Sequence, residues 1–147
     1  MRIVIVNGPN LNLVGKREPS LYGNMPMDKY IEELRNSFAD IDLDYMQSNH
    51  EGDLIDKLQA EGFSADGIVL NAGGYTHTSV ALRDTVAAIS TPVVEVHITD
   101  ISKREPFRRI SLLTDVCKKT ITGKGLEGYR EAIMYLIDKA TKAREVQ

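Results

Sequence analysis

The sequence contains a single cysteine, Cys117, and little that points to a membrane. One cysteine cannot form an intramolecular disulfide, which favours a reducing compartment. The first residues, MRIVIVNG, hold only four consecutive apolar side chains, Ile3 to Val6. Such a run is too short for the apolar part of a signal peptide or for a membrane span. We therefore expect a cytoplasmic protein with no membrane partner.

Several functional classes lack their usual signals. The net charge is only -3 over 147 residues, so the composition does not indicate a nucleic-acid partner. Neither a G-x-G-x-x-G motif nor a P-loop is present to cradle phosphates. A G-x-S-x-G elbow is also absent, which argues against an acyl hydrolase. One cysteine and three scattered histidines argue against a zinc site, and we expect no bound metal.

Apolar runs alternate with helical periods along the whole chain. This alternation is typical of a parallel sheet with helices on both faces. We expect one domain, 1–147, with an α/β fold: a flavodoxin-like three-layer α/β/α sandwich around a five-stranded parallel sheet of order 2-1-3-4-5. The predicted strands are 2–6, 41–46, 66–71, 92–98 and 117–123, and the predicted helices are 27–39, 48–62, 77–89 and 127–143.

Polar side chains collect directly after the predicted strands. Ligands of such sheets bind beyond the carboxyl ends of the strands, so these side chains are candidates for a site. The loop 13–23 carries Tyr22 close to two cations, which is an unusual setting for a tyrosine. The loop is also long for an α/β connection and predicts a lid. The candidates are Asn10, Arg17, Tyr22, Asn71, His77, His97, Arg104 and Arg108.

Each of these motifs also has a purely structural interpretation. NGPN and NAGG are good turn sequences, and Thr76 or Thr78 could cap the helix that follows. Arg104 and Arg108 could form a solvated face if REPFRR is helical. His50 fits a residue that caps or flanks a helix better than a catalytic one, and Cys117 fits a small buried apolar position better than a reactive one.

The pair Glu95 and His97 is a stronger sign of chemistry. The two residues are two positions apart on a predicted strand, so their side chains point to the same face of the sheet. A carboxylate beside an imidazole stabilises the protonated ring and fixes its tautomer.

Six stretches together resemble the type II 3-dehydroquinate dehydratases, the small dehydroquinases of the shikimate pathway. They are NGPNLNLVGKREPSLYG, QSNHEG, GIVLNAGGYTHTSVALRD, PVVEVHITD, REPFR and GKGLEGY. The resemblance implies a flavodoxin-like fold and a dodecamer built as a tetramer of trimers. It implies the conversion of 3-dehydroquinate to 3-dehydroshikimate and water, with no metal or organic cofactor.

The resemblance also implies roles for individual residues. Tyr22 resembles the general base that removes the proton beside the ketone, and Arg17 resembles its activator, with Arg104 as a second arginine. Asn10 resembles the residue that stabilises the enolate through a water, and His97, backed by Glu95, resembles the general acid. The implied substrate ligands are Asn71, His77, Arg108 and Ile98–Thr99, with Asp84 reaching the site from a neighbouring subunit.

The role of Tyr22 as a base beside two arginines is chemically reasonable. A tyrosine is a weak base at neutral pH unless cations stabilise its phenolate, and two arginines suit that task. Thr99 and Asp100 stand where the family usually has Ser-Asn, and Lys119 stands where it commonly has glycine. We expect the added charge of Asp100 to weaken binding of the substrate carboxylate, and Lys119 to alter strand packing or a subunit contact. The alternatives from other classes are a silent flavodoxin-like domain that binds a small anion, and a flavin or nucleotide protein.

Overall fold

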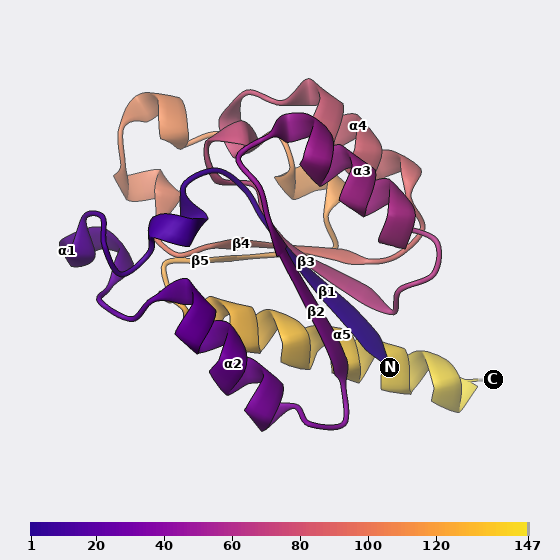
Figure 1. Ribbon diagram of the computed structural model, residues 1–147. Coiled ribbons are helices and arrows are strands. Elements are labelled where there is room, and N and C mark those ends of the chain that lie inside the picture. Colours follow the sequence, from indigo (N-terminus) through magenta and orange to yellow (C-terminus); the bar gives the residue numbers. More distant parts are fainter. Residues whose placement is uncertain (147) are drawn as a thin grey trace.

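The computed structural model describes residues 1–146 and contains a five-stranded parallel sheet (Figure 1). The strand order is β2-β1-β3-β4-β5, as predicted from the alternation of strands and helices. The strands are β1 (Arg2–Asn7), β2 (Asp42–Gln47), β3 (Gly67–Asn71), β4 (Val93–His97) and β5 (Lys119–Thr122). Because every neighbouring pair is parallel, the carboxyl ends of all strands meet at one edge of the sheet.

Helices cover both faces of the sheet and make it the middle of three layers (Figure 1). On one face lie α2 (Met27–Ser37) and α5 (Glu127–Val146), and on the other lie α3 (Glu51–Glu61) and α4 (Val80–Ala88). The β1 strand has apolar residues in succession because each of its faces meets a helical layer. The predicted α/β/α sandwich is therefore confirmed.

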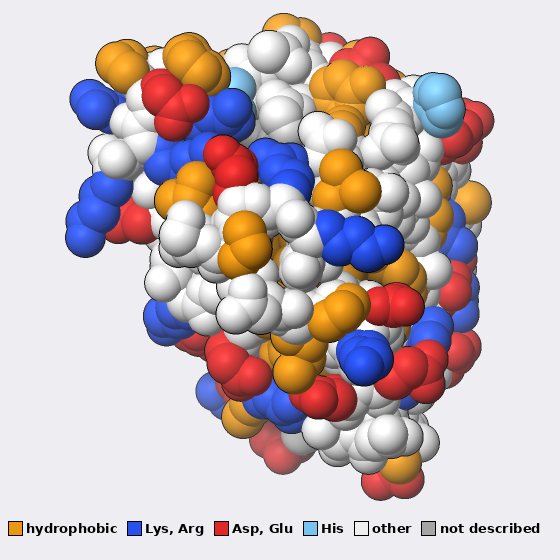
Figure 2. All heavy atoms as spheres, turned by 60° about the vertical axis from the view of Figure 1, so that its left-hand side comes forward, with side chains coloured by type: hydrophobic (Ala, Val, Ile, Leu, Met, Phe, Trp, Pro, Cys, Tyr) orange, Lys and Arg blue, Asp and Glu red, His pale blue; other side chains and the backbone are white. Residues whose placement is uncertain are grey.

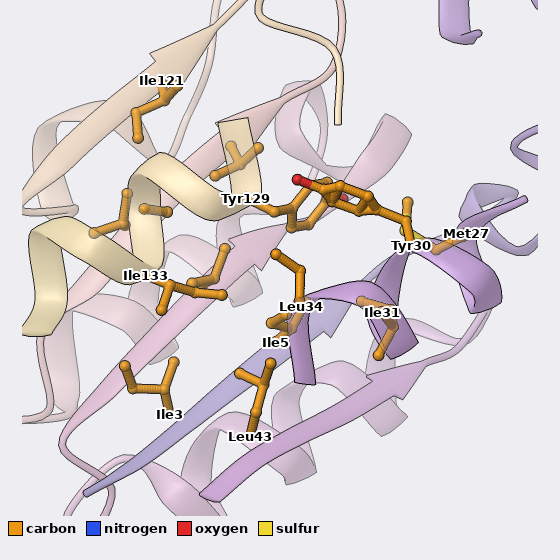
Figure 3. Close-up of a cluster of buried hydrophobic side chains, with 14 of the residues drawn as sticks. Ile3, Ile5, Met27, Tyr30, Ile31, Leu34, Leu43, Ile121, Tyr129 and Ile133 are labelled. Atoms are coloured by element: carbon orange, nitrogen blue, oxygen red, sulfur yellow. The ribbon is translucent and has the colours of Figure 1, made fainter. Parts of the chain in front are cut away.

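The core between the sheet and helices α2 and α5 is built from strand and helix side chains together (Figure 3). Ile3 and Ile5 of β1 are fully buried beneath Leu34 of α2. The rings of Tyr30 and Tyr129 lie 6.5 Å apart and tilted, at the end of this core nearest the strand ends. This packing anchors α5, whose first turn carries Tyr129, against the region where the polar loops gather.

The start of α4 differs from the prediction. A short 3-10 turn, η2 (Gly73–His77), follows β3, and the helix begins only at Val80 rather than at 77. Ser79 caps it, because the Ser79 hydroxyl accepts a 2.9 Å hydrogen bond from the Leu82 amide. The prediction that Thr76 or Thr78 would cap this helix is therefore wrong.

Two other polar loops contain short helical turns, and the sequence had indicated only the one in REPFRR. The predicted lid, 13–23, includes the single turn α1 (Pro19–Tyr22). REPFRR forms only the 3-10 turn η4 (Pro106–Arg108), so Arg104 and Arg108 do not share a helix face. The remaining turns are η1 (Leu11–Leu13), η3 (Ile101–Lys103) and η5 (Thr114–Val116).

Other local predictions are confirmed or modified by the structure. His50 flanks α3 at its N-cap position without a side-chain cap. Cys117 is only half-buried, at the margin of the core under α3 and α4. The Lys119 ammonium lies 5.2 Å from the centre of the Tyr135 ring, so its side chain lies on the α5 side of the sheet. Within residues 1–146, no helix is both long enough and apolar enough to cross a membrane.

Candidate active site

A cavity of about 210 Å³ opens at the carboxyl ends of β1, β3 and β4. Its walls include ten of the residues singled out in the sequence: Asn10, Arg17, Tyr22, Asn71, His77, His97, Ile98, Thr99, Arg104 and Arg108. Gly8 lets the loop after β1 approach the loop after β3, because a Cβ at Gly8 would lie 2.4 Å from the Ala72 carbonyl oxygen. The loops therefore bring polar groups from distant parts of the chain into one hollow.

The cavity lies in a basic part of the surface. Figure 2 shows this side of the molecule, where Lys and Arg side chains gather at the upper left with hydrophobic and a few acidic side chains among them. Arg17, Arg104 and Arg108 supply three cationic groups to the cavity wall. Such a concentration of positive charge suits an anionic ligand.

The Tyr22 hydroxyl lies between two guanidinium groups. Arg104 Nη1 is 2.8 Å and Arg17 Nη2 is 3.1 Å from the Tyr22 oxygen. The guanidinium carbons also lie over the ring, at 4.6 Å for Arg17 and 5.6 Å for Arg104. Since arginine can only donate hydrogen bonds, both contacts favour negative charge on the Tyr22 oxygen.

Tyr22 ends the short helix α1 within the loop that we predict to be a lid. The loop leaves the sheet region at Gly15, which has a left-handed φ of 95°. A Cβ at Gly15 would lie 2.9 Å from the Pro26 nitrogen, so the chain reversal there requires glycine. The side chains of Leu21 and Met25 are exposed around α1, whereas Tyr22 packs against the core below α2 and α5.

Glu95 and His97 form a buried pair on one face of β4. The His97 Nε2 atom lies 2.5 Å from Glu95 Oε2, with Glu95 fully buried and His97 5% exposed. Burial alone would raise the pKa of the Glu95 carboxyl, but the hydrogen bonds from His97, Ser111 and Thr114 outweigh it and lower the pKa to about 2. Glu95 is thus an ionised acceptor, and the hydrogen in this contact belongs to Nε2 of His97.

Asn71 is held in place by a buried chain of hydrogen bonds. Its Nδ2 donates to the Tyr129 hydroxyl at 2.9 Å, and that hydroxyl donates to Asn7 Oδ1 at 2.8 Å. The Asn71 Oδ1 accepts from the Gly73 amide at 3.2 Å. The amide of Asn71 therefore reaches the cavity wall in a single orientation.

The neighbouring histidine is oriented in a comparable way. His77 Nδ1 lies 2.8 Å from the Ile110 carbonyl oxygen. A carbonyl can only accept, so Nδ1 carries a hydrogen. This leaves Nε2 of His77 for a ligand in the cavity.

The remaining wall residues come from strand ends and loops. Asn10 has a left-handed φ of 70°, a conformation that asparagine tolerates better than most residues and that recurs at functional sites. Ile98 and Thr99 follow directly on β4. Arg108 donates from Nε to Glu105 at 2.8 Å, which leaves its terminal nitrogens for other partners.

Asp84 and Asp100 lie outside the cavity wall. Asp84 is exposed on α4. The Asp100 carboxylate caps η3, accepting from the Ser102 amide at 3.1 Å and the Ser102 hydroxyl at 2.6 Å. It also faces Lys103 Nζ at 3.9 Å. The charge of Asp100 is therefore engaged within its own loop.

Supporting residues that the sequence did not reveal surround the site. Ser111, Thr114 and Thr120 contact Glu95, and Tyr129 contacts Asn71. Common serines, threonines and helix-face tyrosines give no local signal of such a role. Among residues 1–146, no three His, Cys, Asp or Glu side chains gather in a way that would hold a metal ion.

Comparisons with known proteins show which family the chain belongs to. Residues 1–137 match the Dehydroquinase class II family. A 3-dehydroquinate dehydratase of an Exiguobacterium species is 51% identical over 139 residues, which cover 94% of this chain and 95% of the relative. One from Bacillus pumilus is 50% identical over 138 residues, covering 92% and 94%.

Solved structures of the same family have the same fold. The crystal structure of the type II dehydroquinase from Butyrivibrio crossotus superposes with a TM-score of 0.87 at 46% identity, covering 92% of this chain and 97% of that one. The Propionibacterium acnes type II dehydroquinase gives a TM-score of 0.85 at 30% identity, covering 95% and 96%. The chain described here belongs to the class II dehydroquinase family.

Proposed function

We propose that this protein converts 3-dehydroquinate to 3-dehydroshikimate and water, with Tyr22 as the base and His97 as the acid. The relatives named 3-dehydroquinate dehydratase cover nearly the whole chain, so the chain is a hydro-lyase of this class. The substrate is a hydroxylated ring that bears a ketone and a carboxylate. The cavity offers amide, hydroxyl, imidazole and guanidinium groups that match it.

In the first step the Tyr22 phenolate takes the proton beside the ketone and becomes a phenol. The electrons of the broken C–H bond form an enolate, whose oxygen needs a positive or hydrogen-bonding partner. Arg17 lines the cavity next to Tyr22 and would stabilise that oxygen directly, while Asn10 would do so through a water. The two arginines on the Tyr22 oxygen support its use as a base.

In the second step the enolate collapses, the C–O bond to the departing hydroxyl breaks, and His97 donates a proton so that water leaves. The contact between Glu95 and Nε2 leaves Nδ1 of His97 as the atom for this transfer. The proton taken by Tyr22 then returns to His97 to complete the cycle. Asn71, His77, Arg108, Ile98 and Thr99 would hold the ring during both steps.

One observation carries this proposal: the Tyr22 oxygen lies within 3.1 Å of two arginines at the wall of the cavity that also contains His97. The test is Tyr22→Phe, which removes only the hydroxyl. Absorbance of the conjugated enone product should show turnover nearly abolished, while calorimetry should show a substrate analogue bound within about threefold of the parent affinity.

Tyr135→Phe provides the matched control, because Tyr135 lies on α5 and not in the cavity wall. It should retain the parent rate. Substantial turnover by Tyr22→Phe would remove Tyr22 as the base. A parent protein that binds the analogue but forms no enone would instead support the silent anion-binding domain.

We also propose a homo-oligomer, a dodecamer in keeping with the family resemblance, in which Asp84 completes the site of a neighbouring subunit. The exposed position of Asp84 on α4, away from its own cavity, supports this. Specific activity should then fall with dissociation, as measured by sedimentation and rate on the same samples. A monomer with full specific activity would contradict it. The cytoplasmic location remains a proposal from the sequence.

A further inference from the structure

The buried Glu95 carboxylate is enclosed by three hydroxyl groups that the reaction scheme does not use. Thr114 and Thr120 donate to Oε1 at 2.7 and 2.9 Å, and Ser111 donates to Oε2 at 2.5 Å. We call Ser111, Thr114 and Thr120 the hydroxyl cage. Its members come from the loop after η4, the first residue of η5, and strand β5.

The cage and His97 together use the whole hydrogen-bonding capacity of the carboxylate. An ionised carboxylate has about four acceptor sites, and here four donors approach it. The Ser111 hydroxyl oxygen also accepts from the Leu113 amide at 3.1 Å, so its own hydrogen points to Glu95. This arrangement stabilises the carboxylate only in its ionised form.

Burial has the opposite effect on the pair. In a low-dielectric site, a proton on Nε2 of His97 can pass to Glu95 and leave two neutral groups, which avoids two buried charges. A neutral His97 is a much weaker proton donor than its protonated form. Whether His97 or Glu95 holds the shared proton therefore depends on how strongly the carboxylate is stabilised.

We propose that Ser111, Thr114 and Thr120 are positioning residues that keep the shared proton on His97 rather than on Glu95. In doing so the hydroxyl cage keeps His97 able to protonate the departing hydroxyl. This inference rests on the proposed role of His97 as the general acid, and it adds three residues that act on that role through Glu95.

The other charged and titratable groups around Glu95 and His97 are consistent with a shared proton that stays on His97. Burial and the charge of Glu95 raise the pKa of the Cys117 thiol to about 12, so Cys117 adds no charge. The Asp115 carboxylate is paired with Arg83 at the surface. On the cavity side, His97 shares the wall with Arg17, Tyr22, Arg104 and Arg108. Within residues 1–146, every hydrogen bond to the Glu95 carboxylate comes from the hydroxyl cage or His97.

The kinetic test removes one hydroxyl at a time with Ser111→Ala, Thr114→Val and Thr120→Val. Each variant should lower kcat roughly 10- to 100-fold, the effect of losing one hydrogen bond to a charged group, while KM stays within about twofold. The alkaline limb of the rate-versus-pH profile should move to higher pH, because a less stabilised carboxylate holds the shared proton more tightly. Thr120→Ser should restore both the rate and the limb.

Thr122→Val is the matched control on the same strand. Among the residues that the structure describes, the Thr122 hydroxyl makes no hydrogen bond to Glu95, so rate and limb should stay at parent values. Thr114 is exposed at the start of a short turn, so Thr114→Val carries the test even if Thr120→Val fails to fold. A variant with reduced kcat but an unmoved alkaline limb would overturn the proposal, and so would parent kcat in Thr114→Val.

Nitrogen NMR of the resting protein provides a readout that does not depend on turnover. The ring signals of His97 are assigned by their loss in His97→Asn. In the parent protein Nε2 should be protonated, and in Thr114→Val the proton should move toward Glu95, so Nε2 should shift toward the signal of an acceptor nitrogen. An unchanged Nε2 signal would refute the proposed role of the hydroxyl cage. A parent protein with no dehydratase activity but with this NMR change would refute only the proposed function.

Discussion

Replacing Arg104 with glutamine should reduce the phenolate form of Tyr22 more than replacing Arg17. The Arg104 contact is shorter, 2.8 against 3.1 Å, and the Arg104 side chain is 13% exposed, compared with 31% for Arg17. Each arginine also faces a carboxylate, Glu18 at 3.4 Å from Arg17 and Glu105 at 3.7 Å from Arg104. The neighbouring charges are therefore similar, and the greater exposure of Arg17 to solvent weakens what it contributes to a negative oxygen.

The size of the difference follows from the contacts. At an effective dielectric constant of about 20, a unit charge pair is worth about 6 kcal/mol at the Arg104 distance and about 5 kcal/mol at the Arg17 distance. After desolvation, a hydrogen bond to a charged group contributes about 1.5 to 3 kcal/mol. We place Arg104 near the upper limit and Arg17 near the lower. The ratio of phenolate to phenol should then fall about 100-fold in Arg104→Gln and about 10-fold in Arg17→Gln.

Ultraviolet absorbance of tyrosinate measures this ratio directly, with each variant compared against the same variant carrying Tyr22→Phe. The protein has six tyrosines, but several do not interfere. Burial raises the pKa of Tyr30 to about 12, and burial also raises the pKa of Tyr45 and Tyr129. Turnover is the wrong assay for this comparison, because Arg17 is also proposed to stabilise the enolate. A larger loss of tyrosinate in Arg17→Gln than in Arg104→Gln would refute the reasoning.

Three further predictions test other parts of the site. Hydrogen bonds that outweigh burial lower the pKa of Glu95 to about 2, so they stabilise the fold above the ordinary glutamate pKa of ~4.3, and this contribution is lost as the pH falls toward 2. The urea midpoint of the parent should therefore drop more steeply over that pH range than the midpoint of Glu95→Gln. Parallel curves for the two proteins would contradict this link between ionisation and stability. Asp100→Asn should leave KM within about twofold, because the carboxylate caps η3; a large fall in KM would show that its charge reaches the substrate. A substrate analogue should protect 13–23 from limited proteolysis, and equal cleavage with and without it would argue against a lid.

The sequence by itself determined the parts of this protein that depend on local periodicity. Alternation of apolar runs and helical periods was enough to predict the five strands, their parallel order and the three layers. The two-residue period of a strand placed Glu95 and His97 on one face of β4, and the structure joins them at 2.5 Å. The rule that ligands bind beyond parallel strand ends placed the cavity at the correct edge of the sheet.

Only the tertiary structure decided which polar groups meet. Tyr22 and Arg104 are 82 positions apart and contact each other because two loops fold over the same strand ends. Thr120 reaches Glu95 because β5 pairs with β4 in a register that sets the two residues side by side. A serine or threonine has the same local pattern whether it faces water or a buried carboxylate. Its role depends on long-range packing, which neither periodicity nor capping preference encodes.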